Sequence, residues 1–295
     1  MNIVYSPIFL RHSLGKTHPE CPARLEVILK ELKAHMKIEI IEPSPASEGD
    51  LSIIHDKGYL KTLENLSKLQ RAFPDNVFSN ETYDIARLAA GAAYDAALLS
   101  KDRFAYANIR PPGHHAGKNS FAGFCYINNI AYAVRKMQLS GKAKRALIVD
   151  FDLHHGNGTF DIFEDDPSVF YLSFHQDPGT TYPGTGFESE GNSHMRNIVL
   201  KEGITENEYM RSFEINLKDA FDSHKPDIIG VSAGFDTYGM DPMGSRLRIS
   251  DASIYHELGK AIMKCNIPTF AVLEGGYYLP TLGKMVYEFL RAFGE

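Results

Sequence analysis

Four continuous apolar runs constrain the fold of this 295-residue chain more than any other feature. They lie at residues 146–149, 169–172, 228–231 and 270–273. Runs of this length without polar alternation are typical of strands that are buried on both faces of a parallel sheet. Helix-like stretches occur between and after them, at residues 206–223, 251–265 and 281–293. This alternation predicts an α/β fold in which helices connect parallel strands by right-handed crossovers.

The first half of the chain continues the same alternation. Apolar spacing predicts strands or extended segments at 2–6 and 104–109, and helices at 22–35, around 59–63, at 80–100 and at 128–139. No internal repeat, low-complexity tract or Pro/Ser-rich linker divides the sequence. We therefore expect a single domain over residues 1–295.

Composition excludes several classes of protein. Hydrophobic residues make up 43% of the chain and the net charge is −6, which argues against a disordered chain and against nucleic acid as the main partner. No stretch approaches the ~18 apolar residues of a membrane span. The first ten residues lack the basic region of a signal peptide, so we expect a cytoplasmic protein without a membrane partner.

Three cysteines cannot build a disulfide framework or an all-thiolate zinc site. Twelve histidines are present, so any metal must be held mainly by histidine and carboxylate ligands.

Polar residues follow three of the apolar runs, at 150–158, 232–236 and 274–277. Sites in parallel α/β sheets form beyond the carboxyl ends of the strands, so these segments could converge on one pocket. Asp150, Asp152 and His154 alternate and would point to the same side of an extended backbone. Aspartates that cap a helix N-terminus are the alternative interpretation of this segment. Asp236 at the end of another run favours a metal site with an open position, which zinc, iron(II), cobalt or manganese could occupy.

A second polar feature is the histidine pair His114–His115, which follows Arg110 and a Pro-Pro-Gly turn. A single histidine in a loop is usually a surface group, but an adjacent pair after a rigid turn favours proton transfer. The segments 121–126, 183–186 and 275–277, taken individually, indicate only turns or core packing.

Together these segments resemble the zinc-dependent histone deacetylase family, including its acetylpolyamine amidohydrolase branch. The similarity covers nearly the whole chain, and its matching strings, in order, are residues 18–24, 110–116, 123–125, 150–158, 182–186, 234–236 and 274–277. The resemblance implies a single-domain, three-layer α/β/α architecture of the arginase–deacetylase type, with a mainly parallel sheet of about eight strands.

The resemblance also implies a catalytic set. Asp152, His154 and Asp236 match zinc ligands, and His114 and His115 match the catalytic pair. The other matches are Asp150, which orients His114; Asn157, which supports His115; and Tyr277, which stabilises an oxyanion. Many members carry Asp where this chain has Asn157, and a neutral partner should leave His115 less basic.

Further matches are expected around the catalytic set. Gly123, Phe124 and Tyr182 match the walls of a tunnel for a lysine-like chain. Arg24 matches an arginine of an internal cavity. Asp150 and Ser173 match ligands of a potassium ion, although Ser173 could equally be a strand-end turn residue.

The resemblance therefore implies a zinc-dependent amidohydrolase, with iron(II) as the alternative ion, that releases acetate from acetyl-lysine or a similar acylated amine. We take His115 as the base and His114 as a charge-tuning partner, although the pair could titrate as one unit. Acetylpolyamine hydrolysis is the alternative function, with Glu20 and Asp177 as candidate acidic residues at the mouth. A two-manganese ureohydrolase and a non-catalytic acyl-lysine binder are further alternatives.

Overall fold

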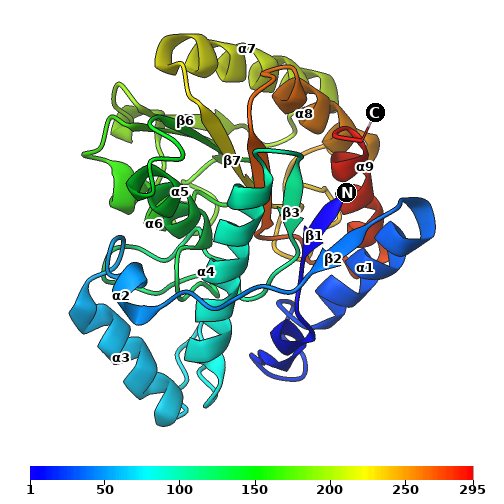
Figure 1. Cartoon of the computed structure of the whole chain (residues 1–295). Helices are drawn as coiled ribbons and strands as arrows, with labels where there is room; N and C mark the ends of the chain where they lie inside the picture. The colour runs from blue at the N-terminus through cyan, green and yellow to red at the C-terminus, as the bar shows by residue number, and fades with distance from the viewer. Residues whose placement is uncertain (295) are drawn as a thin grey trace.

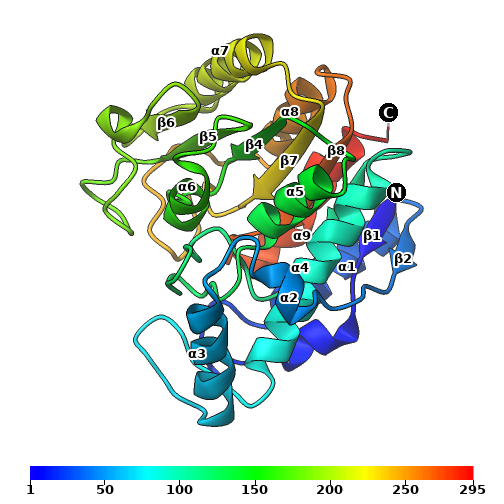
Figure 2. The ribbon, with the colours of Figure 1, turned by 60° about the vertical axis from the view of Figure 1, so that its left-hand side comes forward.

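The computed structural model describes residues 1–294 and contains one eight-stranded sheet. The strand order is β2-β1-β3-β8-β7-β4-β5-β6, and every neighbouring pair is parallel. Helices cover both faces of the sheet (Figures 1 and 2). The predicted three-layer α/β/α fold class is thus confirmed. None of the helices in residues 1–294 has the length and apolar character needed to cross a membrane.

The strands are short at one edge of the sheet and longer at the other. Their bounds are β1 Asn2–Val4, β2 Glu39–Ile41, β3 Ala105–Ala107, β4 Ala146–Asp150, β5 Val169–Gln176, β6 Met195–Leu200, β7 Ile228–Ala233 and β8 Thr269–Leu273. The helices are α1 Ala23–His35, α2 Glu48–Leu51, α3 Lys57–Lys68, α4 Thr82–Leu99, α5 Asn129–Leu139, α6 Asn157–Phe163, α7 Glu206–His224, α8 Ser253–Met263 and α9 Leu279–Arg291. Two 3₁₀ helices span Pro7–Arg11 and Glu188–Glu190.

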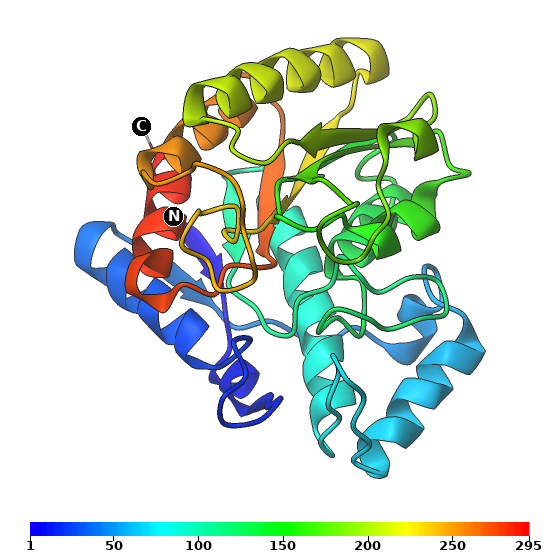
Figure 3. The same ribbon diagram turned by 180° about the vertical axis from the view of Figure 1, so that it is seen from behind.

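The helices form two layers. Helices α4, α5 and α6 lie against one face of the sheet, and α4 crosses in front of it in Figure 1. Helices α1, α9, α8 and α7 pack one against the next on the other face, which Figure 3 shows from behind. Helix α3 lies further out and contacts α4.

Local sequence explains where two of these helices begin. Thr205 and Glu208 form a capping box at the start of α7, in which each side chain bonds the backbone N–H of the other. The side chain of Asn128 accepts a hydrogen bond from the backbone of Ala131 and caps α5. Helix α4 is rich in small residues, and a Cβ at Gly91 would overlap the carbonyl oxygen of Ser44.

The sequence did not predict strands β2 and β6, and the topology gives the reason. Both are edge strands of the sheet. Strand β2 has no buried residue, and burial in β6 is interrupted by partly exposed positions. Neither strand therefore carries the continuous apolar run that identifies a strand buried on both faces.

The topology also determines where chemistry can gather. Strands β8, β7 and β4 are neighbours at the centre of the sheet, and all three run in the same direction. Their carboxyl ends therefore bring residues 274–277, 234–236 and 150–158 to one edge of the sheet.

Candidate active site

Asp152, His154 and Asp236 form a buried cluster beyond the ends of β4 and β7. One ligand atom from each residue lies within 4.8 Å of the other two. The Nδ1 atom of His154 is 3.1 Å from Asp152 Oδ1 and 3.1 Å from Asp236 Oδ2. The remaining carboxylate oxygens are held by backbone groups, since Gly275 N–H donates to Asp152 Oδ2 and Leu153 N–H donates to Asp236 Oδ1.

This cluster fits a divalent cation. Two buried carboxylates in contact with one imidazole need a compensating positive charge. Asp236 Oδ2 is buried and accepts no hydrogen bond from residues 1–294, although His154 Nδ1 is close to it. Such an atom is available to coordinate a metal. The set of two oxygen donors and one nitrogen donor suits zinc or iron(II).

The loop that carries the histidine pair lies beside this cluster. The rings of His114 and His115 are 4.0 Å apart between centroids. His114 Nδ1 is 3.1 Å from Asp150 Oδ2, and His115 Nδ1 is 2.7 Å from Asn157 Oδ1. The structure thus places Asp150 and Asn157 next to the histidines with which the family resemblance pairs them.

The two histidines have opposite electrostatic surroundings. Burial disfavours a charged His114, but the carboxylates of Asp152 and Asp150 outweigh it and raise its pKa to about 10. Burial together with the neighbouring His114 and His154 lowers the pKa of His115 well below its usual value. A cation held at Asp152 would counter part of that carboxylate's effect on His114. His115 is therefore the member of the pair whose surroundings favour the neutral form, which can accept a proton.

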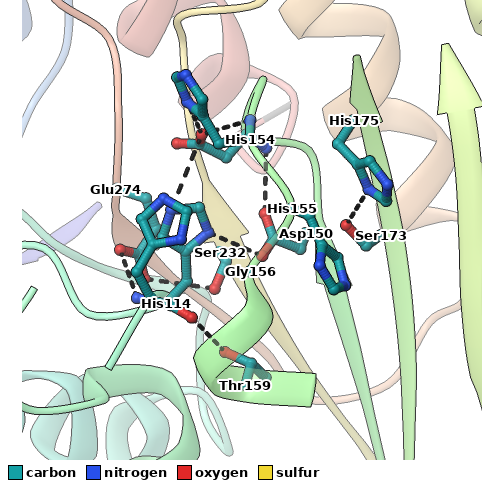
Figure 4. Close-up of polar contacts among 12 residues, drawn as sticks. His114, Asp150, His154, His155, Gly156, Thr159, Ser173, His175, Ser232 and Glu274 are labelled. Carbon is teal, nitrogen blue, oxygen red and sulfur yellow. Dashed lines mark hydrogen bonds and ion pairs between the residues drawn. The ribbon is translucent and has the colours of Figure 1, made fainter. Parts of the chain in front are cut away.

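Two further residues fix His114, and sequence reasoning gave them no role. Glu274 Oε2 accepts a hydrogen bond from the backbone N–H of His114 over 3.2 Å (Figure 4). The same oxygen accepts one from the backbone N–H of Gly113 over 2.7 Å. The hydroxyl of Tyr171 donates to Asp150 Oδ2 over 2.9 Å. Tyr171 is one residue of a buried apolar strand, so its sequence context offered no signal.

Tyr277 closes the site from the β8 side and is 8% exposed. The guanidinium carbon of Arg24 lies 4.6 Å from the centre of its ring. Arg24 is fully buried and donates to the carbonyl oxygens of Gly276 and Glu274, the two residues that flank Gly275. Arg24 thus anchors the segment that carries Tyr277, and its role in an internal cavity remains a prediction.

One pocket of about 200 Å³ joins these groups. Its walls include the predicted tunnel residues Gly123, Phe124 and Tyr182. The other lining residues are Asp75, Pro112, His114, His115, Asp152, His154, Met243, Gly275 and Tyr277. The ring of Tyr182 lies edge-on to His115 at 5.1 Å, and the ring of Phe124 lies edge-on to Tyr277 at 6.1 Å.

The mouth of this pocket differs from the sequence prediction. Glu20 is 1% exposed and accepts hydrogen bonds from both Arg110 and Arg24, so its assignment to the mouth is wrong. Asp177 is not among the lining residues. The exposed carboxylate at the pocket is instead that of Asp75, in a loop without any motif that could have marked it.

Ser173 lies beside Asp150 in the sheet, since the two residues are register partners on β5 and β4. Its hydroxyl is 2.8 Å from His175 Nδ1 (Figure 4). Ser173 is therefore near the carboxylate with which it would share a potassium ion, and that ion remains a prediction.

Comparisons with known proteins agree with this geometry. A family model described as the histone deacetylase domain matches residues 18–293. A probable deacetylase of Methanothermobacter thermautotrophicus is 35% identical over 300 residues, which cover 99% of this chain and 90% of the relative.

Two solved structures are also similar. The HD domain of HDA15 matches with a TM-score of 0.94 and 30% identity, over 100% of this chain and 91% of that one. An acetylpolyamine aminohydrolase from Burkholderia pseudomallei matches with a TM-score of 0.90 and 27% identity, over 100% of this chain and 98% of that one.

Proposed function

Because the chain belongs to the histone deacetylase family, we propose that it is a zinc-dependent amidohydrolase that removes acetyl groups from acetyl-lysine in peptides or proteins. One observation carries this proposal. A single pocket is lined by the histidine pair, by Asp152 and His154 of the buried cluster, and by Tyr277. We further propose that residues 1–295 form one catalytic domain.

Asp152, His154 and Asp236 would hold the zinc ion, with iron(II) as the alternative. Such a cation supplies Lewis acidity, which lowers the pKa of a water molecule towards ~7 and polarises an amide carbonyl. The protein fixes both carboxylates for this purpose, since each has one oxygen bound by a backbone N–H group.

The protein side chains would handle the protons and the developing charge. His115, whose low pKa keeps it neutral, would accept the proton of the attacking water. His114, held by Asp150, would stay charged and favour the negative charge that develops on the carbonyl oxygen. Tyr277 would donate a hydrogen bond from its hydroxyl to the same oxygen. The departing amine would take up a proton from the histidine pair.

The pocket walls support a narrow aliphatic substrate. Phe124 and Tyr182 line the pocket with ring surface, which suits the methylene chain of lysine. The exposed carboxylate of Asp75 can accept a hydrogen bond from a peptide N–H group. It can equally attract the distal ammonium group of an acetylpolyamine, and this second candidate is favoured by the similarity to an acetylpolyamine aminohydrolase.

We also propose a potassium ion beside the zinc site, with Asp150 and Ser173 among its ligands. Their pairing on adjacent strands supports this assignment. Activity assayed in potassium and in a bulky organic cation at equal ionic strength tests it, and equal rates would contradict it.

A substrate panel tests the proposed function. Zinc-reconstituted enzyme is assayed with an acetyl-lysine peptide, N-acetylputrescine and N-acetylspermidine. We expect the highest kcat/KM for the peptide. A clear preference for the polyamines would replace the leading substrate with the alternative. A metal content of two ions per chain would point to a ureohydrolase, and no turnover of any acyl amine would point to a non-catalytic binder.

Asp75→Asn separates the two substrate classes further. The asparagine keeps an acceptor oxygen for a peptide N–H group but loses the charge that attracts an ammonium group. We expect KM to rise more for N-acetylspermidine than for the peptide. Asp177 lies outside the pocket lining, so Asp177→Asn is the control. It should leave KM unchanged for both substrates.

A further inference from the structure

Asp241 is a buried carboxylate that lies outside the catalytic and metal-binding set described above. Its side chain is 5% exposed and lies in an irregular segment between β7 and α8. We call residues 237–249 the rim loop, because this segment closes on itself and contributes Met243 to the pocket wall. The closure consists of a bond from Gly239 N–H to the Ile249 carbonyl and another from the Ser245 hydroxyl to the Thr237 carbonyl.

The carboxylate of Asp241 joins two segments. Its Oδ2 atom accepts hydrogen bonds from the backbone N–H groups of Tyr277 (2.7 Å) and Tyr278 (3.1 Å). Its Oδ1 atom accepts one from Met243 N–H over 3.0 Å. Among residues 1–294, the bonds from Tyr277 and Tyr278 are the only hydrogen bonds that connect the rim loop to residues 274–278.

The hydroxyl of Tyr277 has no hydrogen-bond partner within residues 1–294, so nothing polar in that part of the chain fixes its direction. Its position depends on the ring contacts with Arg24 and Phe124 and on its own backbone. The backbone N–H of Tyr277 is bound by Asp241 alone. A change in that bond therefore moves the point from which the hydroxyl projects into the pocket.

Keeping a carboxylate at this position is costly. Burial, assisted by the nearby carboxylate of Asp236, raises the pKa of Asp241 to about 7. The three backbone donors offset part of that cost.

We propose that Asp241 is a positioning residue, whose carboxylate ties the backbone of Tyr277 to the rim loop and so sets the place of the Tyr277 hydroxyl in the pocket. Through the same carboxylate, the position of Met243 at the pocket wall is coupled to the position of the hydroxyl. This inference rests on the proposed function, in which that hydroxyl donates to the developing oxyanion.

The substitutions Asp241→Ala and Asp241→Asn test the proposal at two strengths. Alanine leaves all three backbone N–H groups without their acceptor. Asparagine has one acceptor oxygen, so it can serve the Tyr277 and Tyr278 donors or the Met243 donor, but not both sets. A displacement of ~1 Å at a catalytic group costs about 10² in rate. We therefore expect kcat to fall about 10²-fold in the alanine variant and less in the asparagine variant, with KM changed less than about 3-fold in both.

A double-mutant cycle distinguishes positioning from general support of the fold. Each Asp241 substitution is made in the wild-type enzyme and in Tyr277→Phe, and kcat is measured with the acetyl-lysine peptide. If Asp241 acts through the hydroxyl, its substitution should change kcat less than about 3-fold once the hydroxyl is absent. An equal loss of kcat in both backgrounds would overturn the proposal, as would loss of bound zinc in the Asp241 variants.

Asp227→Asn is the matched control. Asp227 also accepts hydrogen bonds from backbone N–H groups, those of Lys144 and Arg145, but at the opposite end of the sheet. The Asp227→Asn substitution should leave kcat unchanged. If the alanine variant does not fold, the asparagine variant alone completes the cycle and decides the outcome. An inactive wild-type enzyme would refute the proposed function, whereas an active wild type with additive losses would refute only the role of Asp241.

Discussion

Gly275 occupies the place where the two candidate metal-binding carboxylates approach the β8 segment. A Cβ atom at this position would overlap Oδ2 of Asp152 and Oδ2 of Asp236. The position therefore needs glycine because of close approach, not because of backbone conformation.

From this we predict that Gly275→Ala disrupts metal binding. The added methyl must displace one of the carboxylates, and three protein ligands leave no spare donor. We expect the zinc content after dialysis to fall well below one ion per chain, as measured by mass spectrometry. Gly184→Ala is a control in open space, although its positive φ adds local strain. Full zinc occupancy in Gly275→Ala would show that the added methyl group displaces neither carboxylate from the ion.

Tyr277 contributes a single hydroxyl to the site, and its ring packing does not depend on that atom. We predict that Tyr277→Phe folds, keeps its metal and loses about 10²–10³ in kcat, the usual effect of removing one oxyanion donor. Circular dichroism and metal analysis check the first two points, and peptide turnover checks the third. Near-normal kcat would remove Tyr277 from the catalytic set.

At the same scale, the sequence predicted the residues that form local patterns. Asp150, Asp152 and His154 alternate at the end of a buried strand, and the structure places them at one edge of the sheet. Glu274, Asp241 and Tyr171 support the site through hydrogen bonds with other segments of the chain. These contacts join residues that are 161, 36 and 21 positions apart, respectively. No helix or strand period connects residues at such separations, so only the folded chain reveals these contacts.

At the scale of the elements, the predicted helices and central strands are those with a periodic or continuous apolar pattern. The predicted helix at 80–100 corresponds to α4, and the apolar run at 146–149 corresponds to β4. Most element ends differ by one or two residues, because caps and turns, not apolar residues, determine where a helix begins. The larger differences are at the ends of β5 and α3, which extend to Gln176 and Lys68.

The segment before α1 is held to the histidine loop by a buried ion cluster. Arg110 donates to Glu20 Oε2 over 2.7 Å, and Arg24 donates to Glu20 Oε1 over 3.2 Å. All three side chains are almost fully buried. Burial alone would raise the pKa of Glu20, but Arg110 in particular lowers it to about 2.

We predict that Glu20→Gln costs about 3–5 kcal/mol of unfolding free energy at pH 7, since two buried guanidinium groups lose their counter-charge. The carboxylate stabilises the fold fully above its unfolded pKa of 4.5, and this contribution is lost as the pH falls towards 2. The difference between wild type and variant should therefore shrink by about 2 kcal/mol between pH 7 and pH 3.

Urea unfolding of both proteins across that pH range checks this prediction. Glu26→Gln, on the exposed face of α1, should show no such difference. If the difference in unfolding free energy between wild type and Glu20→Gln stays constant or grows at low pH, Glu20 is not the charged partner of Arg110 in the folded protein.

At the scale of the whole molecule, the candidate metal site joins three segments that are distant in the sequence. Asp152 and His154 follow β4, Asp236 follows β7, and Gly275 after β8 donates its N–H to Asp152. These strands are the centre of the sheet, so an ion at their ends connects both halves of the fold. Without a cation, two buried carboxylates must share the proton of one histidine.

We therefore predict that metal removal destabilises the entire domain and not only the loops of the site. An ion that binds the folded state alone adds about 4 kcal/mol of stability at a thousandfold excess over its Kd. Chelation should lower Tm by several degrees, and zinc should restore it. Asp236→Ala should show neither response, because it lacks one of the three ligands, whereas Asp177→Ala should respond like the wild type. The same Tm for chelated and zinc-loaded wild-type protein would mean that the cluster is a hydrogen-bonded network without a structural ion.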